Sequence, residues 1–309
     1  MITKEFVDYI GSKTKIEKRE LIEKDFLLQE LLLELQKEKY FRENFVFKGG
    51  TCLIKCYLGY FRFSEDLDFS FIKQNLFKNK SENQIRKLLS KEINIFLNII
   101  EEISKKIYLD FKSSKGNRKY IELGGNNKFL TLKLWYKSQI LNEEQFIKIQ
   151  INFVDLFKYK FKRKKANSIS KNINIEETKF LFPEYVDVAT KEINIVCYDL
   201  KEILLEKFRA LLTRKGVKAR DFIDIYFILK YLEKDFKIFK KDILDKTVFM
   251  LRYYKYKRNL LEKEELLKNY EIKEVEKLLL IEPDKDFYEF NKKLATFVNG
   301  LIVEIKGLF

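Results

Sequence analysis

Residues near position 50 could form a binding site for a phosphate group. The apolar segment 44–48 predicts a short strand, and Gly49, Gly50 and Thr51 follow it and open a helix that ends near residue 60. Backbone N–H groups at the start of a helix can bind an anion, and glycine lets a phosphate come close to the backbone. Thr51 would add a hydroxyl donor. This strand, turn and helix therefore predict an anion site.

A pair of acids on the next predicted strand, residues 66–72, could hold a metal ion. Residues two apart on a strand point to the same side, so Asp66 and Asp68 would project together. Adjacent carboxylates repel each other unless a cation lies between them, and hard oxygen ligands select Mg²⁺ or Mn²⁺. Arg62 and Ser64 would lie beside the acids as phosphate donors. A metal held here could bridge a triphosphate during displacement at phosphorus.

Each of these two features has a simpler explanation when it is taken alone. A Gly-Gly pair is commonly an ordinary turn, and an Asp-x-Asp pair on a strand is often a solvent-exposed face. Their order along the chain, separated by one helix, favours a nucleotide site.

The composition excludes several other kinds of active site. The 309 residues include no histidine, so Ser-His-Asp and Cys-His catalysis and histidine-based zinc sites are excluded. Any general base must be Asp, Glu, Lys or Tyr. The formal net charge of +15, from 62 Lys and Arg against 47 Asp and Glu, favours a nucleic-acid partner. A lysine-rich surface that only maintains solubility would give the same charge.

The cysteines and the hydrophobic pattern suggest an ordinary globular protein. We interpret Cys52 and Cys56, four residues apart in an apolar stretch, as small core residues rather than as a metal clip or a disulfide. The N-terminal residues do not resemble a signal peptide, and no apolar run reaches the roughly 18 residues that a membrane span needs. We expect a cytoplasmic protein with no membrane partner.

The pattern of elements predicts an α+β fold that changes in character near residue 200. Up to that point helices and strands alternate, whereas the chain from Asp199 onward is nearly all helical. We expect helices at 3–40 and 82–106, strands at 108–112, 129–136, 146–153 and 193–197, a turn at 124–127, and a basic loop at 156–175. Pro283 is expected between C-terminal helices.

Residues 47–51 and 62–68 together resemble the first motif of the AbiEii-type nucleotidyltransferase family. These proteins are toxins of type IV toxin–antitoxin and phage abortive infection systems, within the polymerase-beta-like superfamily. The resemblance implies a nucleotidyltransferase core over residues 1–200, with a small mixed sheet flanked by helices, and a helical domain over 201–309. It also implies that the Gly-Gly turn and the acidic pair bind nucleotide and metal, with Ser64 in the active site.

Residues 199–229 predict two helices that carry unusual charges. Asp199 and Glu202 suggest a capping box at the start of the first. The second is apolar almost all round and would be buried, so Asp221 and Asp224 would destabilise it unless they are paired. One explanation makes Asp221 the N-cap and pairs Asp224 with Arg214 or Arg220.

The same residues also resemble later motifs of the family. Lys207 begins a Lys-x-x-Ala-Leu pattern, and residues 220–224 match Arg-Asp-x-x-Asp. The resemblance, which covers roughly residues 45–230, implies that Lys207 contacts the triphosphate and that Asp221 is a catalytic or positioning acid. Asp224 is assigned with them to nucleotide binding.

One departure concerns a third carboxylate that relatives often carry on a later strand. The expected position is Gln150, an amide, and Asp155 lies beyond the end of that strand. Three explanations stay open: the third acid is dispensable, Asp221 replaces it, or activity is reduced.

The acceptor is inferred from charge and from the resemblance. Residues 252–258 interleave Arg and Lys with tyrosines, a pattern that suits phosphate contacts and base stacking, although an ordinary helix with a buried tyrosine face would explain it too. Some family members modify tRNA. We therefore expect transfer of a nucleoside monophosphate from an NTP to RNA, with the tRNA 3′ end favoured, and a possible antitoxin partner. The alternatives are a protein or small-molecule acceptor, and a non-catalytic nucleotide- or RNA-binding protein.

Overall fold

A computed structural model describes residues 2–263, 267, 279–282 and 284–308. The chain forms two compact units, one of Met1–Asp155 with Phe161–Cys197 and one of Leu156–Lys160 with Tyr198–Phe309. Pro283, expected between C-terminal helices, lies outside the described residues.

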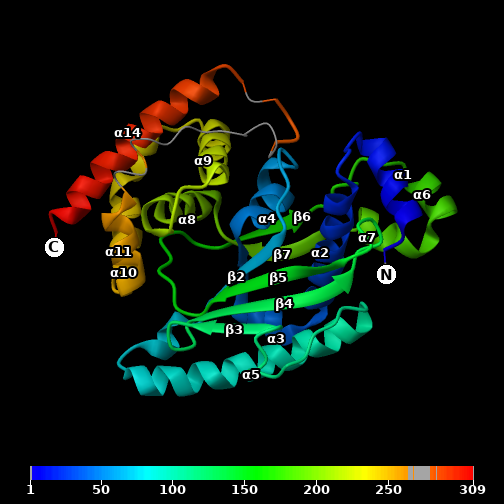
Figure 1. The fold of residues 1–309 in the computed structure, drawn as a ribbon, viewed down its shortest axis with the longest axis horizontal. Coiled ribbons are helices and arrows are strands. Elements are labelled where there is room, and N and C mark those ends of the chain that lie inside the picture. The colour runs from blue at the N-terminus through cyan, green and yellow to red at the C-terminus, as the bar shows by residue number, and fades with distance from the viewer. Residues whose placement is uncertain (1, 264–266, 268–278, 283, 309) are drawn as a thin grey trace. The chain divides into compact units, whose positions relative to one another are not determined.

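The first unit is built on a mixed seven-stranded sheet in the order β3-β4-β5-β2-β1-β7-β6 (Figure 1). At its centre β1 pairs with β2 antiparallel and with β7 parallel, and β2 pairs with β5 parallel. The predicted α+β fold, a mixed sheet flanked by helices, is confirmed. The strands are β1 Phe45–Lys48, β2 Asp66–Phe71, β3 Ile121–Gly124, β4 Phe129–Lys137, β5 Glu144–Asn152, β6 Lys162–Ala166 and β7 Ile193–Cys197.

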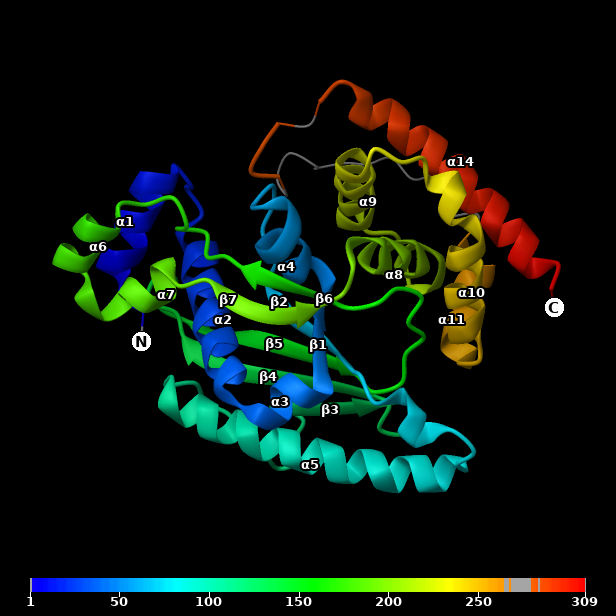
Figure 2. The ribbon, with the colours of Figure 1, turned by 180° about the vertical axis from the view of Figure 1, so that it is seen from behind.

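Helices with one apolar face cover this sheet. Helix α2 packs on β5, β7 and α5 (Figure 2). Phe96 of α5 contacts Phe45 at the start of β1, with ring centroids 4.9 Å apart. All four residues of β1 are buried, and the strand leads directly into the Gly-Gly turn. The helices are α1 Lys4–Thr14, α2 Arg19–Lys37, α3 Lys39–Asn44, α4 Gly49–Leu53, α5 Glu82–Lys106, α6 Ile175–Leu181 and α7 Val186–Thr190, and a π-helical turn spans Ile54–Leu58.

Two predicted elements at the sheet edges differ from the structure. The strand expected at 108–112 is wrong, because only Asp110 forms a bridge there, to Trp135. The edge strand is instead β3, which reaches β4 through the turn expected at 124–127. The basic loop expected at 156–175 contains strand β6, which pairs with β7. Lysines are common on edge strands because their charge blocks pairing with another chain.

The second unit is helical, with α8 Leu200–Thr213 packed against α9 Ala219–Leu232, α10 Lys240–Leu251, α11 Tyr254–Leu261 and α14 Asp286–Lys306. Asp199 caps α8 by accepting a bond from the N–H of Lys201. The expected partner in a capping box, Glu202, is instead fully buried and ion-paired with Lys246. Within the described part of the chain, no helix is both long and apolar enough to cross a bilayer.

Candidate active site

The Gly-Gly turn lies directly against the second acid of the predicted pair. Gly49 has φ +79°, a left-handed conformation that favours glycine, and a Cβ added there would lie 2.2 Å from Asp68 Oδ2. Lys48, the residue before the turn, is the cross-strand partner of Asp68 in the β1–β2 ladder. The absence of a side chain at Gly49 therefore leaves room for the Asp68 carboxylate beside the start of α4.

The second glycine of the turn lies against the predicted phosphate donors. A Cβ on Gly50 would be 2.7 Å from Arg62 Nη2 and 2.9 Å from Ser64 Oγ. Thr51 is fully buried, and its hydroxyl hydrogen-bonds with Ser64 Oγ at 2.9 Å and with the carbonyl oxygen of Asp66. The structure thus brings the Gly-Gly-Thr turn, Arg62, Ser64 and the acidic strand together. The Thr51 hydroxyl ties the helix to that strand and does not face solvent.

Lys148 on β5, which was not among the predicted site residues, lies beside the acidic pair on β2. Lys148 Nζ lies 2.9 Å from Asp66 Oδ2. In the parallel β2–β5 ladder Asp66 is opposite Lys148, and Asp68 is opposite Gln150. These four side chains share one face of the sheet because alternate strand residues point the same way. The alternation of β5 was visible in the sequence, but its register with β2 was not.

Asp155, the acid that follows the strand on which a third carboxylate was expected, already has side-chain partners. Asp155 is buried, accepts a bond from Ser70 Oγ at 2.8 Å and forms an ion pair with Lys48 at 3.2 Å. Ser70 is two residues beyond Asp68 on the same strand, so Asp155 reaches the same face of the sheet. Gln150 presents an amide opposite Asp68.

A buried ion pair links the π-helical turn that follows α4 to helix α2. Lys55, in the π-helical turn that continues α4, lies 2.9 Å from Asp25 Oδ1 on α2 and also donates to Gln29 and Tyr60. Side-chain exposure is 0% for Lys55 and 1% for Asp25. Burial lowers the pKa of Lys55, and the Asp25 charge opposes that shift.

Replacing Gly49 by alanine is predicted to disrupt the site. The new Cβ would collide with the Asp68 carboxylate and would also strain the backbone, because its φ is +79°. Gly59 is a matched control in the same unit, with φ +74° and open space around its position. Gly59→Ala carries only the backbone strain, about 1–3 kcal/mol at its φ of +74° and ψ of −174°. We expect Gly49→Ala to lose nucleotide binding, measured by equilibrium dialysis with labelled NTP, while Gly59→Ala retains it. Equal binding by the two variants would contradict the placement of Asp68.

In the second unit the predicted charged residues form one buried cluster. Lys207 Nζ on α8 lies 2.6 Å from Asp224 Oδ2 and 3.6 Å from Asp221 Oδ1 on α9, and both acids are buried. Helix α9 begins at Ala219, two residues before the predicted start, so Asp221 lies in its first turn and is not the N-cap. Arg214 pairs with Asp221 at 2.5 Å, whereas a pair with Asp224 was one of the predicted alternatives. The structure thus brings Lys207, Asp221 and Asp224 together.

A further lysine lies close to this cluster. The Lys263 ammonium donates to the carbonyl oxygens of Arg214 and Gly216, just after α8 ends. Burial, and then the nearby Arg214 charge, lower the pKa of Lys263 to about 8, while Asp221 opposes the shift. The second unit therefore gathers three cationic side chains around two buried carboxylates.

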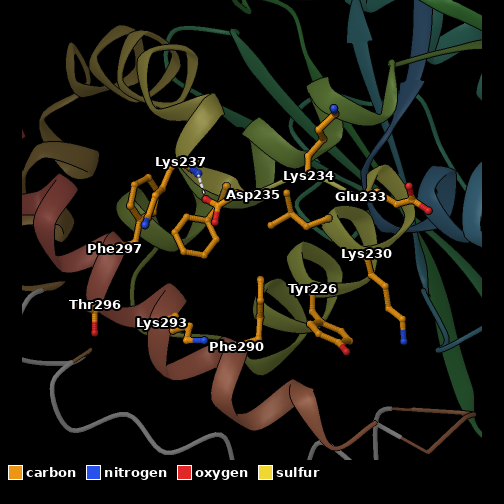
Figure 3. Close-up of a pocket in the computed structure, with 12 residues that line it drawn as sticks. Tyr226, Lys230, Glu233, Lys234, Asp235, Lys237, Phe290, Lys293, Thr296 and Phe297 are labelled. Carbon is orange, nitrogen blue, oxygen red and sulfur yellow. Dashed lines mark hydrogen bonds between the residues drawn. The ribbon is translucent and has the colours of Figure 1, made fainter.

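The second unit also contains an aromatic and basic groove of about 750 Å³ between the end of α9 and α14 (Figure 3). Its floor includes Phe236 and Phe297, whose ring centroids are 4.6 Å apart. Four lysines line it together with two acids, and Lys234 and Lys237 are exposed, with no ion pair to another described residue. The lining residues are Tyr226, Leu229, Lys230, Glu233, Lys234, Asp235, Phe236, Lys237, Phe290, Lys293, Thr296 and Phe297.

Comparison with known proteins identifies a family for most of the chain. Residues 31–299 match the family model described as nucleotidyl transferase AbiEii toxin, type IV TA system. That range contains the Gly-Gly-Thr turn, the acidic pair Asp66 and Asp68, and the buried cluster of Lys207, Asp221 and Asp224.

Among solved structures, two crystal structures from Helicobacter pylori are similar over nearly their whole length. The first, JHP933, has 18% identity and a TM-score of 0.41, covering 92% of this chain and 94% of that chain. The second, described as a "putative nucleotidyltransferase", has 19% identity and a TM-score of 0.40, covering 92% and 97%. No curated protein sequence matches this chain closely.

Proposed function

The chain belongs to the AbiEii family of nucleotidyl transferase toxins of type IV toxin–antitoxin systems, and we propose that it transfers a nucleoside monophosphate from an NTP to RNA, with tRNA as the favoured acceptor. The observation that supports this proposal is the position of the turn, where a Cβ on Gly49 would lie 2.2 Å from Asp68 Oδ2 and a Cβ on Gly50 would lie 2.7 Å from Arg62 Nη2 and 2.9 Å from Ser64 Oγ. A turn that accepts phosphate next to paired carboxylates is the arrangement that nucleotidyl transfer needs.

The residues present suit a divalent metal that is shared with the substrate. Asp66 and Asp68 offer hard carboxylate oxygens on one face of β2, and Mg²⁺ is commonly held by one or two carboxylates together with substrate phosphates. Lys148 Nζ forms an ion pair with Asp66 at 2.9 Å, and a metal bound by Asp66 would compete with this ammonium for the carboxylate. When bound, Mg²⁺ or Mn²⁺ would neutralise charge on the phosphates as pyrophosphate leaves.

The side chains around the turn would hold the NTP for attack at its α-phosphorus. Arg62 and Ser64 would donate to phosphate oxygens, and the backbone N–H groups that begin α4 would add further donors. An acceptor hydroxyl forms the new P–O bond while the bond to pyrophosphate breaks. Because the chain has no histidine, a carboxylate such as Asp66 or Asp68 is our candidate for taking the hydroxyl proton.

We assign the charged cluster of the second unit to the triphosphate. Lys207 would contact the phosphates, and Asp221 and Asp224 would position its ammonium, which they contact at 3.6 and 2.6 Å. Asp221 is also the candidate for a catalytic acid. Truncating Asp224 would remove the nearer of the two acids that hold the Lys207 ammonium, so we propose a positioning role for Asp224.

The acceptor proposal rests on charge and on exposed aromatic side chains. The net charge is +15, and the second unit carries the lysine-lined groove of Figure 3. Tyr254, in the run 252–258, is 78% exposed, so the explanation of that run as a buried tyrosine face does not hold for this residue. Exposed aromatic rings among lysines suit single-stranded RNA, whose bases stack on the rings while its phosphates meet the charges.

Reversing two groove charges is predicted to weaken RNA binding. Lys234→Glu with Lys237→Glu would remove two phosphate contacts and introduce repulsion, so we expect the Kd for tRNA to rise about tenfold or more at low salt. The matched control is Lys241→Glu with Lys292→Glu, which makes the same charge change at exposed positions outside the groove. Fluorescence anisotropy over a salt series gives Kd and its slope. If the two double variants weaken binding equally, only the overall charge matters and the groove is not the RNA site.

Membership of the family also implies an antitoxin partner. We propose that the cognate antitoxin is encoded next to this protein. We expect the wild-type protein expressed alone to arrest growth, and co-expression with its neighbouring genes to relieve that arrest. Arrest that persists with both neighbouring genes expressed would exclude them as the antitoxin.

Label transfer tests the proposed function. The purified protein is incubated with Mg²⁺, total tRNA and each α-³²P-labelled NTP in turn, and the products are divided between nuclease and protease treatment. We expect a labelled band that nuclease removes and protease leaves. A band that only protease removes would replace RNA by a protein acceptor. No label with any NTP, beside a working transferase control, would favour the non-catalytic nucleotide-binding alternative.

A further inference from the structure

All three cysteines of the chain meet at one place behind the Gly-Gly-Thr turn. Cys52 follows Thr51 directly, Cys56 lies in the π-helical turn, and Cys197 ends β7. Their sulfur atoms lie within 4.8 Å of one another. Cys52 and Cys197 are buried and Cys56 is partly exposed, and all three thiols are free. The sequence-based interpretation of Cys52 and Cys56 as core residues did not include Cys197, which only the fold brings to them.

The cluster has the electrostatic features of a site for a thiophilic cation. Hydrogen bonds from Cys52 and Cys56, and a third from Tyr57 at 3.6 Å, lower the pKa of Cys197 and favour its thiolate. Burial and the Cys197 thiolate raise the pKa of Cys52. The three sulfur atoms lie within 4.8 Å of one another, so a cation bound among them would replace thiol protons. Releasing protons in this way is the usual consequence when a metal binds cysteine.

The spacing of the sulfur atoms also fits a metal ion. Three sulfurs bound at about 2.3 Å from one ion lie roughly 3.8–4.0 Å apart, depending on whether the geometry is tetrahedral or trigonal. The observed limit of 4.8 Å therefore requires a closure of about 1 Å or less between the most distant pair. A π-helical turn supplies one ligand, and such turns occur frequently at functional sites.

We propose that Cys52, Cys56 and Cys197 form a binding site for a single thiophilic cation, Zn²⁺ or Cu⁺. Thiolates select these soft or borderline ions over Mg²⁺. A bound ion would connect α4 and its π-helical turn to β7, because these three elements each supply one cysteine. Cys197 is also opposite Phe47 in the β1–β7 ladder, and Phe47 lies just before Lys48 and Gly49. The site is distinct from the proposed Asp66 and Asp68 metal position in both ligands and ion class, and it does not depend on the proposed function.

The composition makes the test unusually specific. Because the chain contains no histidine and no fourth cysteine, any thiolate-to-metal signal must come from this cluster. The reduced full-length protein is titrated with Co²⁺ as a spectroscopic substitute for Zn²⁺. We expect a near-ultraviolet thiolate-to-cobalt absorption band that saturates at one equivalent. Separate titrations with Zn²⁺ against a chelating dye, and with Cu⁺ against a Cu⁺-specific chelator, decide between the two ions.

Four variants control the interpretation. Cys56→Ser changes the partly exposed ligand and is the least disruptive, whereas Cys52→Ser and Cys197→Ser change buried ones. Each should lose the band while keeping a native circular dichroism spectrum. The Asp66→Asn, Asp68→Asn double variant should keep the band. A wild-type protein with three titratable thiols and no band, or a band that survives Cys56→Ser and Cys52→Ser, would overturn the proposal. A disulfide between two of the cysteines in place of metal binding would overturn it as well.

Discussion

Asp66→Asn and Asp68→Asn are each expected to lower the rate of nucleotide transfer by about a thousandfold, a change of about 4 kcal/mol in transition-state stabilisation. Asparagine keeps the size of the side chain and removes the charge that would hold a divalent cation against the phosphates. The rate is measured as initial label transfer from the active α-labelled NTP, so the loss is independent of any toxicity assay.

The control for this prediction is the same substitution of aspartate by asparagine at an exposed residue outside the proposed site. Asp187 on α7 is exposed, with 82% of its side chain accessible, and Asp187→Asn should transfer nucleotide at the wild-type rate. If either acidic variant keeps more than about a tenth of the wild-type rate, the acidic pair is not the metal site. A loss shared by Asp187→Asn would point instead to a general effect of charge on folding or RNA binding.

Lys55→Met is predicted to have the largest effect on stability. Removing the ammonium leaves the Asp25 carboxylate buried, with the Tyr60 hydroxyl as its remaining side-chain donor among the described residues. Breaking one partner of a buried ion pair costs about 3–5 kcal/mol in the free energy of unfolding. Urea denaturation followed by tryptophan fluorescence measures this directly, because the single tryptophan, Trp135 on β4, lies in the first unit.

Two further variants separate burial from charge. Lys91→Met on α5 makes the same substitution at an exposed position and should change stability by less than about 0.5 kcal/mol. Lys55→Met combined with Asp25→Leu removes both charges and should recover most of the loss, since an apolar pair of similar volume often replaces a buried ion pair without cost. A loss for Lys55→Met no larger than that of Lys91→Met would show that the ion pair does not hold α4 in place.

Local patterns were sufficient to predict the elements that carry their own hydrophobic periodicity. The helix at 82–106 and the strand at 193–197 match α5 and β7 at both ends. The edges of the sheet were not predictable in this way. Strand β6 contains four Lys or Arg residues and one alanine, and only its pairing with β7 makes it a strand. Residues 108–112 alternate like a strand, but only Asp110 reaches β4, where it bridges Trp135 beyond the part of β4 that pairs with β3.

The candidate site divides in the same way into local and non-local parts. The Gly-Gly turn and the acidic pair lie within one strand–helix–strand unit, so their spacing alone predicted that they meet. Lys148 was not found because its contact with Asp66 depends on the register between β2 and β5, which are distant in sequence. The partner of Asp221 depends on how α8 packs on α9, and for that reason Arg214 was assigned to the wrong acid among the alternatives.

The most direct test of the central claim is a count of the hard metal ions bound at Asp66 and Asp68. Mn²⁺ binding is followed by electron paramagnetic resonance with a non-hydrolysable NTP analogue present, and Mn²⁺ has little affinity for the thiol cluster. We predict nucleotide-dependent Mn²⁺ binding by the wild-type protein that disappears in the Asp66→Asn, Asp68→Asn double variant and persists in Asp187→Asn. Equal Mn²⁺ binding by the wild-type protein and the double variant would contradict it.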